Sequence, residues 1–497
     1  MRTRTVVMAL VLVAVIAALA VVLIPRLAQQ TAPQAYWPTE GWRTSTPEEQ
    51  GFDSGKLAEM LQALHTTVPG LHSLLIIRNG DVVLDAYFYP YDNGLPHKLA
   101  SVTKSFMTTL IGIAADQGKL QLDQPMISFF PDRTIANLDA RKERITVRHL
   151  AGMMNGYQSG CLAGDEPTLN LMRSQPDWIQ AALDREMVAE PGTVNCYDSP
   201  GMHLLSAILQ KATGMTAVDF GRQYLFEPLG IHDVYWEPDP QGYSHGWGDL
   251  YLTPRDAAKI GYLWLNHGMW EGKQIVSAAW VEDAVTAHSD GGSDDYGYGW
   301  WVSDEDYYAM GRGGQNIKVH PAFNAIVVTT GSSFDYDRLT PMLAAAMVDS
   351  GKPLPANPAA VAALNALVPV LAQPPDAPPA GRLPDMAGVI SGKVYVLEPN
   401  DDAVASLKFE FTGDAEAALY VNIQSKDEVW QIGLDGKYRR SADGSGCRGY
   451  WVDAQTFVLE RFRDGVSIRR LRFEGDRVEV GSPGSSRVMY TGQAGIP

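Results

Sequence analysis

The sequence is poor in cysteine and in positive charge. Its 497 residues include three cysteines, Cys161, Cys196 and Cys447, which are too few for a disulfide scaffold, and their spacing matches no metal-binding motif. Lysine and arginine together number 40, against 57 aspartate and glutamate residues, which gives a formal net charge of −17 at pH 7. This acidic balance argues against nucleic acids and anionic lipid surfaces as partners.

The rest of the composition is that of an ordinary globular protein, with 45% hydrophobic and 20% charged residues. A chain of this length is too long for one compact core, so we expect two or three domains.

The N-terminus carries a targeting signal. Residues 5–25 form an uncharged apolar run that is about long enough to span a bilayer. Arg2 and Arg4 precede it, so the positive-inside rule places the rest of the chain outside the cytoplasm. We therefore expect residues 1–26 to be a transmembrane signal anchor and the catalytic part to be periplasmic or extracellular. A cleaved signal peptide is the alternative, and in either case a disulfide between the first two cysteines becomes permissible.

Periodicity and composition divide the remaining chain into three parts. In residues 27–350 strand patterns, including a hairpin around Asn79-Gly80, are followed by helical patterns and then by strands again. This order describes one α/β domain with a helical lobe. Residues 351–384 are rich in proline and alanine and predict a linker. Residues 385–497 alternate like strands and predict a small β-barrel or sandwich, in which nothing indicates catalysis.

One motif in the α/β part carries nucleophilic chemistry. Ser101 and Lys104 are three residues apart at the start of an apolar run with helical spacing, so they share one face and the amine can reach the hydroxyl. A serine alcohol becomes a good nucleophile only when a neighbouring base takes its proton. Ser-x-x-Lys alone is a weak signal that a surface helix can carry by chance, but no other serine here has a lysine three places later.

Tyr197 is the candidate for a third catalytic group. It lies in an irregular stretch just before an expected buried helix, where a phenol can share a proton network with Ser101 and Lys104. A nearby ammonium favours the phenolate form, which can act as a general base. The alternative interpretation is a half-buried structural tyrosine.

A glycine-rich turn at 311–315 follows a strand-like segment. Glycines inside a strand pattern mark close backbone approach. We therefore expect a backbone N–H of Gly313, Gly314 or Gln315 to hold a substrate oxyanion together with the N–H of Ser101. The turn is not a phosphate loop, because no Gly-Lys-Ser/Thr follows it.

Together these segments resemble the serine β-lactamase and penicillin-binding superfamily, in the branch with class C β-lactamases, related esterases, D-amino-acid peptidases and 6-aminohexanoate-dimer hydrolases. The resemblance rests on the order and spacing of five segments between Trp42 and Asp349: Ser101–Lys104, Ile145–Leu150, Pro191–Ser199, Leu252–Asp256 and Tyr296–Trp301. It implies a β-lactamase-like α/β fold, in which an antiparallel sheet is flanked by helices and joined by an all-helical lobe. It also implies that Ser101 is the nucleophile, Lys104 the proton-relay lysine and Tyr197 the general base, with no cofactor.

Two departures from the family pattern bear on the substrate. The family's Tyr-x-Asn is here Tyr197-Asp198-Ser199, so an amide that would hold a substrate's acylamino group becomes the shorter hydroxyl of Ser199. The family's Lys/His-Thr-Gly is here Gly311-Arg312-Gly313, which lacks the cation at its first position. A β-lactam carboxylate would lose a charge-assisted contact worth about 1.5–3 kcal/mol there, so antibiotic hydrolysis is the less expected activity.

The sequence therefore predicts a serine hydrolase that cleaves a small-molecule ester or amide through an acyl-enzyme on Ser101. A D-amino-acid peptidase or β-lactamase is the first alternative, and it would turn over D-alanyl peptides or nitrocefin as fast as simple esters. The second is a non-catalytic binding protein that keeps the fold and interacts through its C-terminal β part. It would be favoured if Ser101→Ala left every hydrolysis unchanged.

Overall fold

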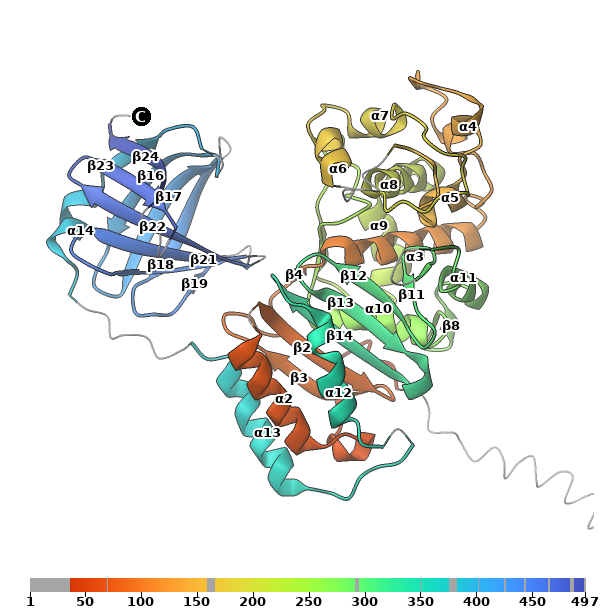
Figure 1. Cartoon of the computed structure of the whole chain (residues 1–497), viewed down its shortest axis with the longest axis horizontal. Helices are drawn as coiled ribbons and strands as arrows, with labels where there is room; N and C mark the ends of the chain where they lie inside the picture. Colours follow the sequence, from red (N-terminus) through yellow and green to blue (C-terminus); the bar gives the residue numbers. More distant parts are fainter. Residues whose placement is uncertain are drawn as a thin grey trace, which may run out of the picture.

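The computed structural model describes residues 36–495, apart from 69, 159–165, 291–294, 350, 375–381, 401, 424–425, 442–443, 464 and 483–486. The described chain forms a larger α/β body and a β-barrel at its C-terminal end (Figure 1).

A nine-stranded sheet lies at the centre of the α/β body, in the order β1-β3-β2-β14-β13-β12-β11-β10-β9. The strand bounds are β1 (Arg43–Thr44), β2 (Leu71–Arg78), β3 (Asp81–Tyr87), β9 (Ser289–Asp290), β10 (Asp295–Tyr296), β11 (Trp301–Val302), β12 (Tyr307–Gly311), β13 (Gln315–His320) and β14 (Ala325–Gly331). The short β1 runs parallel to β3, and the remaining pairs are antiparallel. Pairing of β2 with β14 joins the first strands of the chain to the later ones in one sheet.

The hairpin of β2 and β3 shows how the local sequence sets this sheet. Asn79 and Gly80 both have positive φ values, 53° and 82°, as a two-residue hairpin turn requires, so the predicted hairpin is confirmed. β2 is buried along its whole length, and neighbouring residues alternate between two hydrophobic cores, with Leu75 in one and Ile76 in the other. Both faces of the sheet are therefore covered.

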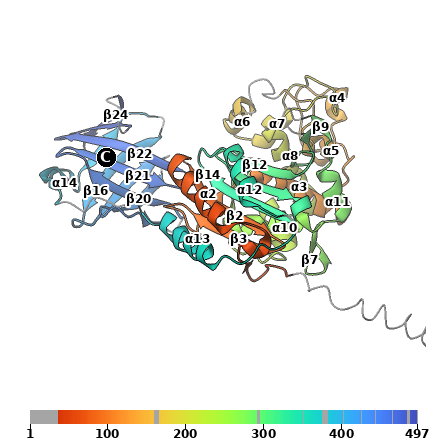
Figure 2. The ribbon, with the colours of Figure 1, turned by 60° about the horizontal axis from the view of Figure 1, so that its bottom comes forward.

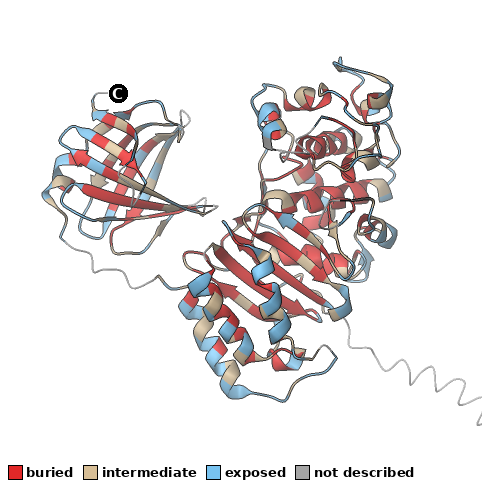
Figure 3. Cartoon of the chain, viewed as in Figure 1, coloured by how far each residue is buried: buried red, intermediate tan, exposed pale blue. Residues whose placement is uncertain are grey.

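Helices cover these two faces (Figure 2). One face carries α2 (Ser54–Thr67), α12 (Thr340–Ala346) and α13 (Pro358–Leu371), and the other carries α3 (Thr103–Asp116) and α10 (Pro254–Leu265). The strands between them are buried, while the outer sides of α2, α12 and α13 are exposed (Figure 3). This layered arrangement is the predicted α/β fold.

A helical lobe is inserted between β3 and β9. It is formed by α4 (Ala140–Glu143), α5 (Val147–Ala151), α6 (Glu166–Arg173), α7 (Trp178–Leu183), α8 (Ser199–Thr213) and α9 (Ala217–Gly221). The buried α8 contacts α3, α5, α6 and α7, so it ties the lobe to the sheet layer. Smaller elements complete this region: β4 (His97–Lys98), β5 (Tyr235–Trp236), β6 (Leu250–Leu252), β7 (Met269–Trp270), β8 (Lys273–Gln274), α11 (Ala278–Ala284), the 3-10 turn η2 (Ala100–Val102) and the π-turn η4 (Arg222–Phe226).

Part of the predicted linker 351–384 is a helix of the α/β body. α13 begins at Pro358 after Asn357, whose side chain accepts a hydrogen bond from the Ala360 N–H. Its alanine and leucine residues favour helix, and Leu364 and Leu371 are buried in the core beside α2. Composition suggested a linker because prolines flank a segment that is, by itself, a capped apolar helix.

The C-terminal region is a closed β-barrel that begins after α14 (Asp385–Ile390). Its ten strands follow the order β18-β17-β16-β15-β24-β23-β22-β21-β20-β19, and a parallel pairing between β18 and β20 closes the circle. The strand bounds are β15 (Val394–Leu397), β16 (Val404–Phe411), β17 (Glu416–Ile423), β18 (Lys426–Gly433), β19 (Arg439–Arg440), β20 (Gly446–Trp451), β21 (Thr456–Phe462), β22 (Val466–Glu474), β23 (Arg477–Gly481) and β24 (Val488–Ala494). Of the predicted alternatives, the structure is the barrel and not the sandwich.

An aromatic contact joins the barrel to the α/β body. The ring of Tyr91 lies 5.7 Å from the ring of Phe462, and Tyr438 belongs to the same buried cluster. The Tyr438 N–H donates to the Tyr89 hydroxyl at 3.2 Å, and the Arg440 guanidinium donates to the Pro90 carbonyl at 2.8 Å.

The predicted fold class included an N-terminal transmembrane helix, and the structure does not support this part of the prediction. Among the described residues no helix is both long and apolar enough to cross a bilayer. α8, with 15 residues, is shorter than the roughly 20 residues that a spanning helix needs. The segment 1–26, to which the helix was assigned, lies outside the described residues.

Candidate active site

The structure brings Ser101 and Lys104 into contact. The Lys104 amine donates to the Ser101 hydroxyl at 3.0 Å and to the Trp247 carbonyl at 3.0 Å. Lys104 is 1% exposed, whereas Ser101 is half-buried and open to a substrate. A buried amine thus lies behind an accessible hydroxyl, as nucleophile activation requires.

Ser101 lies in the turn before the helix and not in the helix itself. η2 spans Ala100–Val102, and α3 begins at Thr103. Ala100 has a φ of +46°, a left-handed conformation that is costly for a residue with a side chain. This turn holds the Ser101 side chain just before the N-terminus of α3, one helical turn from Lys104.

Tyr197, the predicted general base, lies beside Lys104 on the loop before α8. The centre of its ring lies 4.6 Å from the Lys104 amine. Its other side stacks on Trp301, at 6.0 Å between ring centres and 15° between planes. Tyr296 meets the ring edge-on at 6.3 Å, and burial, with an electrostatic contribution from its neighbour Tyr197, raises the pKa of Tyr296 well above its usual value. The tyrosine ring is therefore fixed between the lysine and an aromatic wall.

Asp198 anchors the loop that carries Tyr197. Its fully buried carboxylate accepts two hydrogen bonds from Arg185, at 2.6 and 3.0 Å, and one from the Asn155 amide at 2.8 Å. In the sequence Asp198 is only the middle residue of Tyr197-Asp198-Ser199, and neither Arg185 nor Asn155 was predicted as its partner. An aspartate next to the candidate base, followed by an apolar helix, was the signal that a cation must be buried with it.

A second cluster of polar and charged side chains supports the carbonyl that Lys104 uses. Trp247 stacks on His245, whose Nδ1 lies 2.7 Å from an oxygen of Asp249, and Lys98 contacts the same carboxylate at 2.8 Å. Burial opposes ionisation of Asp249, but the hydrogen bond from His245 and the charge of Lys98 outweigh it and hold the pKa of Asp249 well below its usual value. The loop that presents the Trp247 carbonyl is therefore rigid.

The same loop contains a possible metal-ligand group among the described residues. Ligand atoms of Glu237, His245 and Asp249 lie within 4.8 Å of one another. The carboxylate of Asp249 is already engaged by Lys98 and His245. We assign it a structural role.

The glycine-rich turn lies against Ser101 at its first residue. A side chain at Gly311 would begin 2.6 Å from the Leu99 carbonyl oxygen and 3.0 Å from the Ser101 nitrogen. The side-chain amide of Gln315 donates to the Gly331 carbonyl at 2.6 Å and accepts from the Gly331 N–H at 3.0 Å. The segment next to the nucleophile is therefore the end of β12.

The other residues predicted to contact the substrate are Gly313, Gly314 and Ser199. Gly313 and Gly314 have φ values of +95° and +99°, and added side chains would meet Gly331 and Phe334. Ser199 is the first residue of α8 and is 2% exposed.

With this geometry in view, comparison with known proteins gives the family. Residues 57–366 match the family model described as Beta-lactamase. The chain belongs to the Beta-lactamase family. Its relatives include hydrolases, and the chain is a serine hydrolase of this family.

Two curated relatives illustrate the range of the family. The chain is 24% identical over 311 residues to a 6-aminohexanoate-dimer hydrolase from Paenarthrobacter ureafaciens, which covers 56% of this chain and 79% of the relative. It is 27% identical over 264 residues to penicillin-binding protein 4 from Amycolatopsis lactamdurans, which covers 48% of this chain and 65% of the relative.

Solved structures support the fold. A putative 6-aminohexanoate-dimer hydrolase from Bacillus anthracis superimposes with a TM-score of 0.53 at 18% identity, over 63% of this chain and 88% of that one. EstCE1, described as a hydrolase with promiscuous acyltransferase activity, superimposes with a TM-score of 0.50 at 17% identity, over 60% and 99%.

Proposed function

We propose that this Beta-lactamase family enzyme cleaves small-molecule esters or short amides through an acyl-enzyme on Ser101. The observation that carries the proposal is the contact of 3.0 Å between the Lys104 amine and the Ser101 hydroxyl, with the Tyr197 ring 4.6 Å from the same amine.

In this mechanism the Ser101 oxygen attacks the substrate carbonyl carbon, and its proton passes to the Tyr197–Lys104 pair. The resulting oxyanion accepts hydrogen bonds from the backbone N–H of Ser101 and from a backbone N–H of the glycine-rich turn that begins at Gly311, the residue that lies against the Ser101 nitrogen. The pair then returns the proton to the leaving alcohol or amine as the carbon–oxygen or carbon–nitrogen bond breaks. Water, deprotonated by the same pair, releases the acid and restores Ser101.

The substrate class follows from what the site lacks. Gly311 stands where the family pattern has a cation, so a substrate carboxylate would lose a charge-assisted contact there. A neutral ester or amide makes no such demand. The similarity to a penicillin-binding protein supports the alternative of D-amino-acid peptidase or β-lactamase activity, which the experiment below includes.

The test combines labelling with a substrate screen. The purified protein is treated with a fluorophosphonate probe and mapped by mass spectrometry, and we expect the label on Ser101 and its loss in Ser101→Ala. Initial rates are then compared for p-nitrophenyl butyrate, a D-alanyl anilide and nitrocefin, with the ester expected to be fastest. Labelling at another residue would refute the nucleophile, and nitrocefin turnover matching that of the ester would favour the alternative.

We also propose that the enzyme acts outside the cytoplasm. Cys196 is disulfide-bonded, and stable disulfides are typical of oxidising compartments. Cys161, the other cysteine of the predicted pair, lies outside the described residues. Alkylation of cysteines in intact cells, followed by mass spectrometry, tests the proposal, because a reduced Cys196 in the native protein would contradict it.

A further inference from the structure

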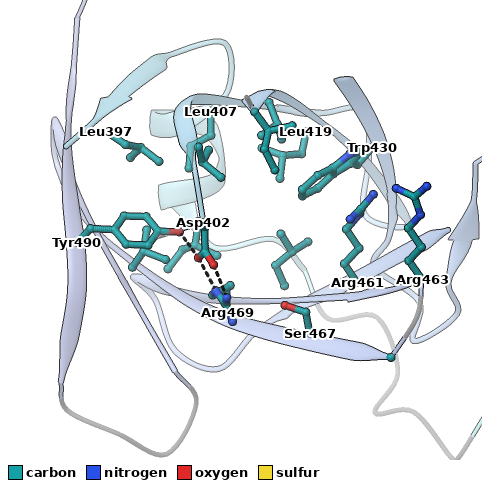
Figure 4. A pocket seen from close by; sticks show the side chains of 17 residues that line it. Leu397, Asp402, Leu407, Leu419, Trp430, Arg461, Arg463, Ser467, Arg469 and Tyr490 are labelled. Atoms are coloured by element: carbon teal, nitrogen blue, oxygen red, sulfur yellow. Dashed lines mark hydrogen bonds and ion pairs between the residues drawn. The ribbon is translucent and has the colours of Figure 1, made fainter. Parts of the chain in front are cut away.

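The C-terminal barrel is filled at one end and hollow at the other. Phe409, Phe457 and Phe473 pack edge-to-face at the filled end, with ring centres 5.4 to 6.0 Å apart for the pairs that include Phe409. The hollow end is a cavity of about 450 Å³ (Figure 4). This volume lies within the range of small-molecule sites, and barrels of eight or so strands are wide enough to hold one small ligand.

The wall of this barrel cavity is apolar. Leucines from several strands line it, including Leu397, Leu407 and Leu419, and Trp430 closes one side. Part of its polar surface is already satisfied, because Arg469 binds Asp402 through two contacts at 2.7 and 2.9 Å and the Tyr490 hydroxyl donates to Asp402 at 2.8 Å. That network is neutral and closed on itself.

Arg461 is different. It lines the cavity at the same end as Trp430, with its guanidinium carbon 4.3 Å from the centre of the Trp430 ring (Figure 4). Its Nε is buried and has no hydrogen-bond partner among the described residues. The nearest carboxylate, Glu428, is 3.9 Å away and already accepts a hydrogen bond of 2.7 Å from the Trp430 indole. A buried donor left unpaired costs stability, which is typical of a site that awaits a ligand.

The charge of the lining agrees with this reading. Three arginines, Arg461, Arg463 and Arg469, line the cavity with one carboxylate, Asp402, so the lining carries an excess of positive charge in a chain that is acidic overall. A guanidinium in an apolar cavity binds a carboxylate strongly, because both groups are shielded from water.

We propose that the barrel cavity is a binding site for an amphipathic carboxylate, with a single apolar chain among the leucines and its carboxylate on Arg461. The site is separate from Ser101 and does not depend on the chemistry there. A purely structural role for Arg461, as a cation covering Trp430, would leave the apolar hollow beside it without an occupant.

The experiment is calorimetric titration of the full chain carrying Ser101→Ala, so that turnover cannot contribute heat, with decanoate as the probe. We expect saturable binding at one site, about fourfold tighter for decanoate than for nonanoate because one more methylene is buried. Arg461→Gln should weaken binding by about tenfold or more. Leu419→Phe, which narrows the hollow while leaving the charges in place, should also weaken it.

Two controls separate this site from non-specific association. Arg472→Gln removes an exposed arginine of β22 that pairs with Glu474, and binding should be unchanged. Decyltrimethylammonium has the same chain and the opposite charge and should bind far more weakly. The proposal is overturned if decanoate does not bind, if Arg461→Gln and Leu419→Phe bind it as the parent does while their thermal unfolding is normal, or if the cation binds equally well.

Discussion

At the scale of single residues, the account depends on Lys104 and Tyr197 acting as one proton-accepting unit. Lys104→Ala and Tyr197→Phe should each lower kcat/KM for p-nitrophenyl butyrate by about 10²–10⁴-fold, the usual contribution of a general base. Because both groups serve the same proton transfer, the double variant should lose little more than either single variant. Steady-state kinetics check this.

Lys56→Ala is the matched control for the lysine change. Lys56 is exposed and pairs with the exposed Glu59 in α2, so its removal should leave kcat/KM unchanged. Losses that multiply in the Lys104→Ala/Tyr197→Phe variant would mean that the two groups act independently, against the account.

Asp198 gives a second residue-scale prediction, on stability. Asp198→Ala leaves the guanidinium of Arg185, with 8% of its side chain exposed, without its buried counter-ion. Removing one partner of a buried pair costs about 3–5 kcal/mol in the free energy of unfolding. Urea denaturation measures it, with Asp219→Ala as the control because the Asp219–Arg222 pair is exposed. A loss below about 1 kcal/mol for Asp198→Ala would show that the pair is not the anchor.

At the scale of elements, β12 and the turn η2 must approach closely for the site to form. Gly311→Ala places a methyl group 2.6 Å from the Leu99 carbonyl oxygen and 3.0 Å from the Ser101 nitrogen, so one of the two segments has to move. A displacement of about 1 Å in an active site can cost about 10²-fold in rate, and we expect a loss of kcat of that order. Ester kinetics and the rate of fluorophosphonate labelling report it.

Gly388→Ala in α14 is the control, because an added methyl group there meets nothing within 4 Å. It should keep full activity. Wild-type rates for Gly311→Ala would show that the approach of β12 is not needed for catalysis.

The contact between β2 and β4 makes stability depend on pH. His72 on β2 is buried, stacks on Tyr91 and lies 2.7 Å from His97 on β4. Burial, with a smaller contribution from His97, lowers the pKa of His72 to about 2. Below about pH 6.5 the His72 imidazole therefore binds a proton in the unfolded chain but not in the folded protein. The free energy of unfolding falls as the pH drops from there.

The size of this effect is measured by the difference between the parent and His72→Gln. The parent should lose up to about 1.4 kcal/mol more per pH unit below pH 6 than the variant, in urea denaturation at several pH values. His65→Gln, which removes an exposed histidine of α2, should follow the parent. Parallel curves for His72→Gln and the parent would contradict the assignment.

At the scale of the whole molecule, local signals were predictable and distant contacts were not. The Asn79-Gly80 turn and the Ser101–Lys104 spacing are written in adjacent residues, and the structure has both the hairpin and the contact. The Trp247 carbonyl that holds Lys104 is 143 residues away along the chain, and no local pattern announces such a partner. Closure of the barrel by β18 and β20 is likewise a long-range pairing.

Composition alone was a poor guide to the segment between the two domains. The proline-flanked segment that contains α13 suggested a linker, but its apolar face completes a core with α2. The glycine-rich turn shows a related limit, because its first residue, Gly311, lies against the Ser101 nitrogen while the Gln315 side chain binds Gly331. Which side of a turn faces the nucleophile is decided by tertiary packing.

The most direct test of the central claim is a trapped acyl-enzyme formed from the substrate itself. The protein is mixed rapidly with p-nitrophenyl butyrate, quenched in acid and digested, and the mass of the peptide containing Ser101 is determined by mass spectrometry. The account predicts a burst of p-nitrophenolate and a butyryl group on Ser101 that is absent from Ser101→Ala. Ester hydrolysis that proceeds at full rate in Ser101→Ala, or a butyryl group on any other residue, would contradict it.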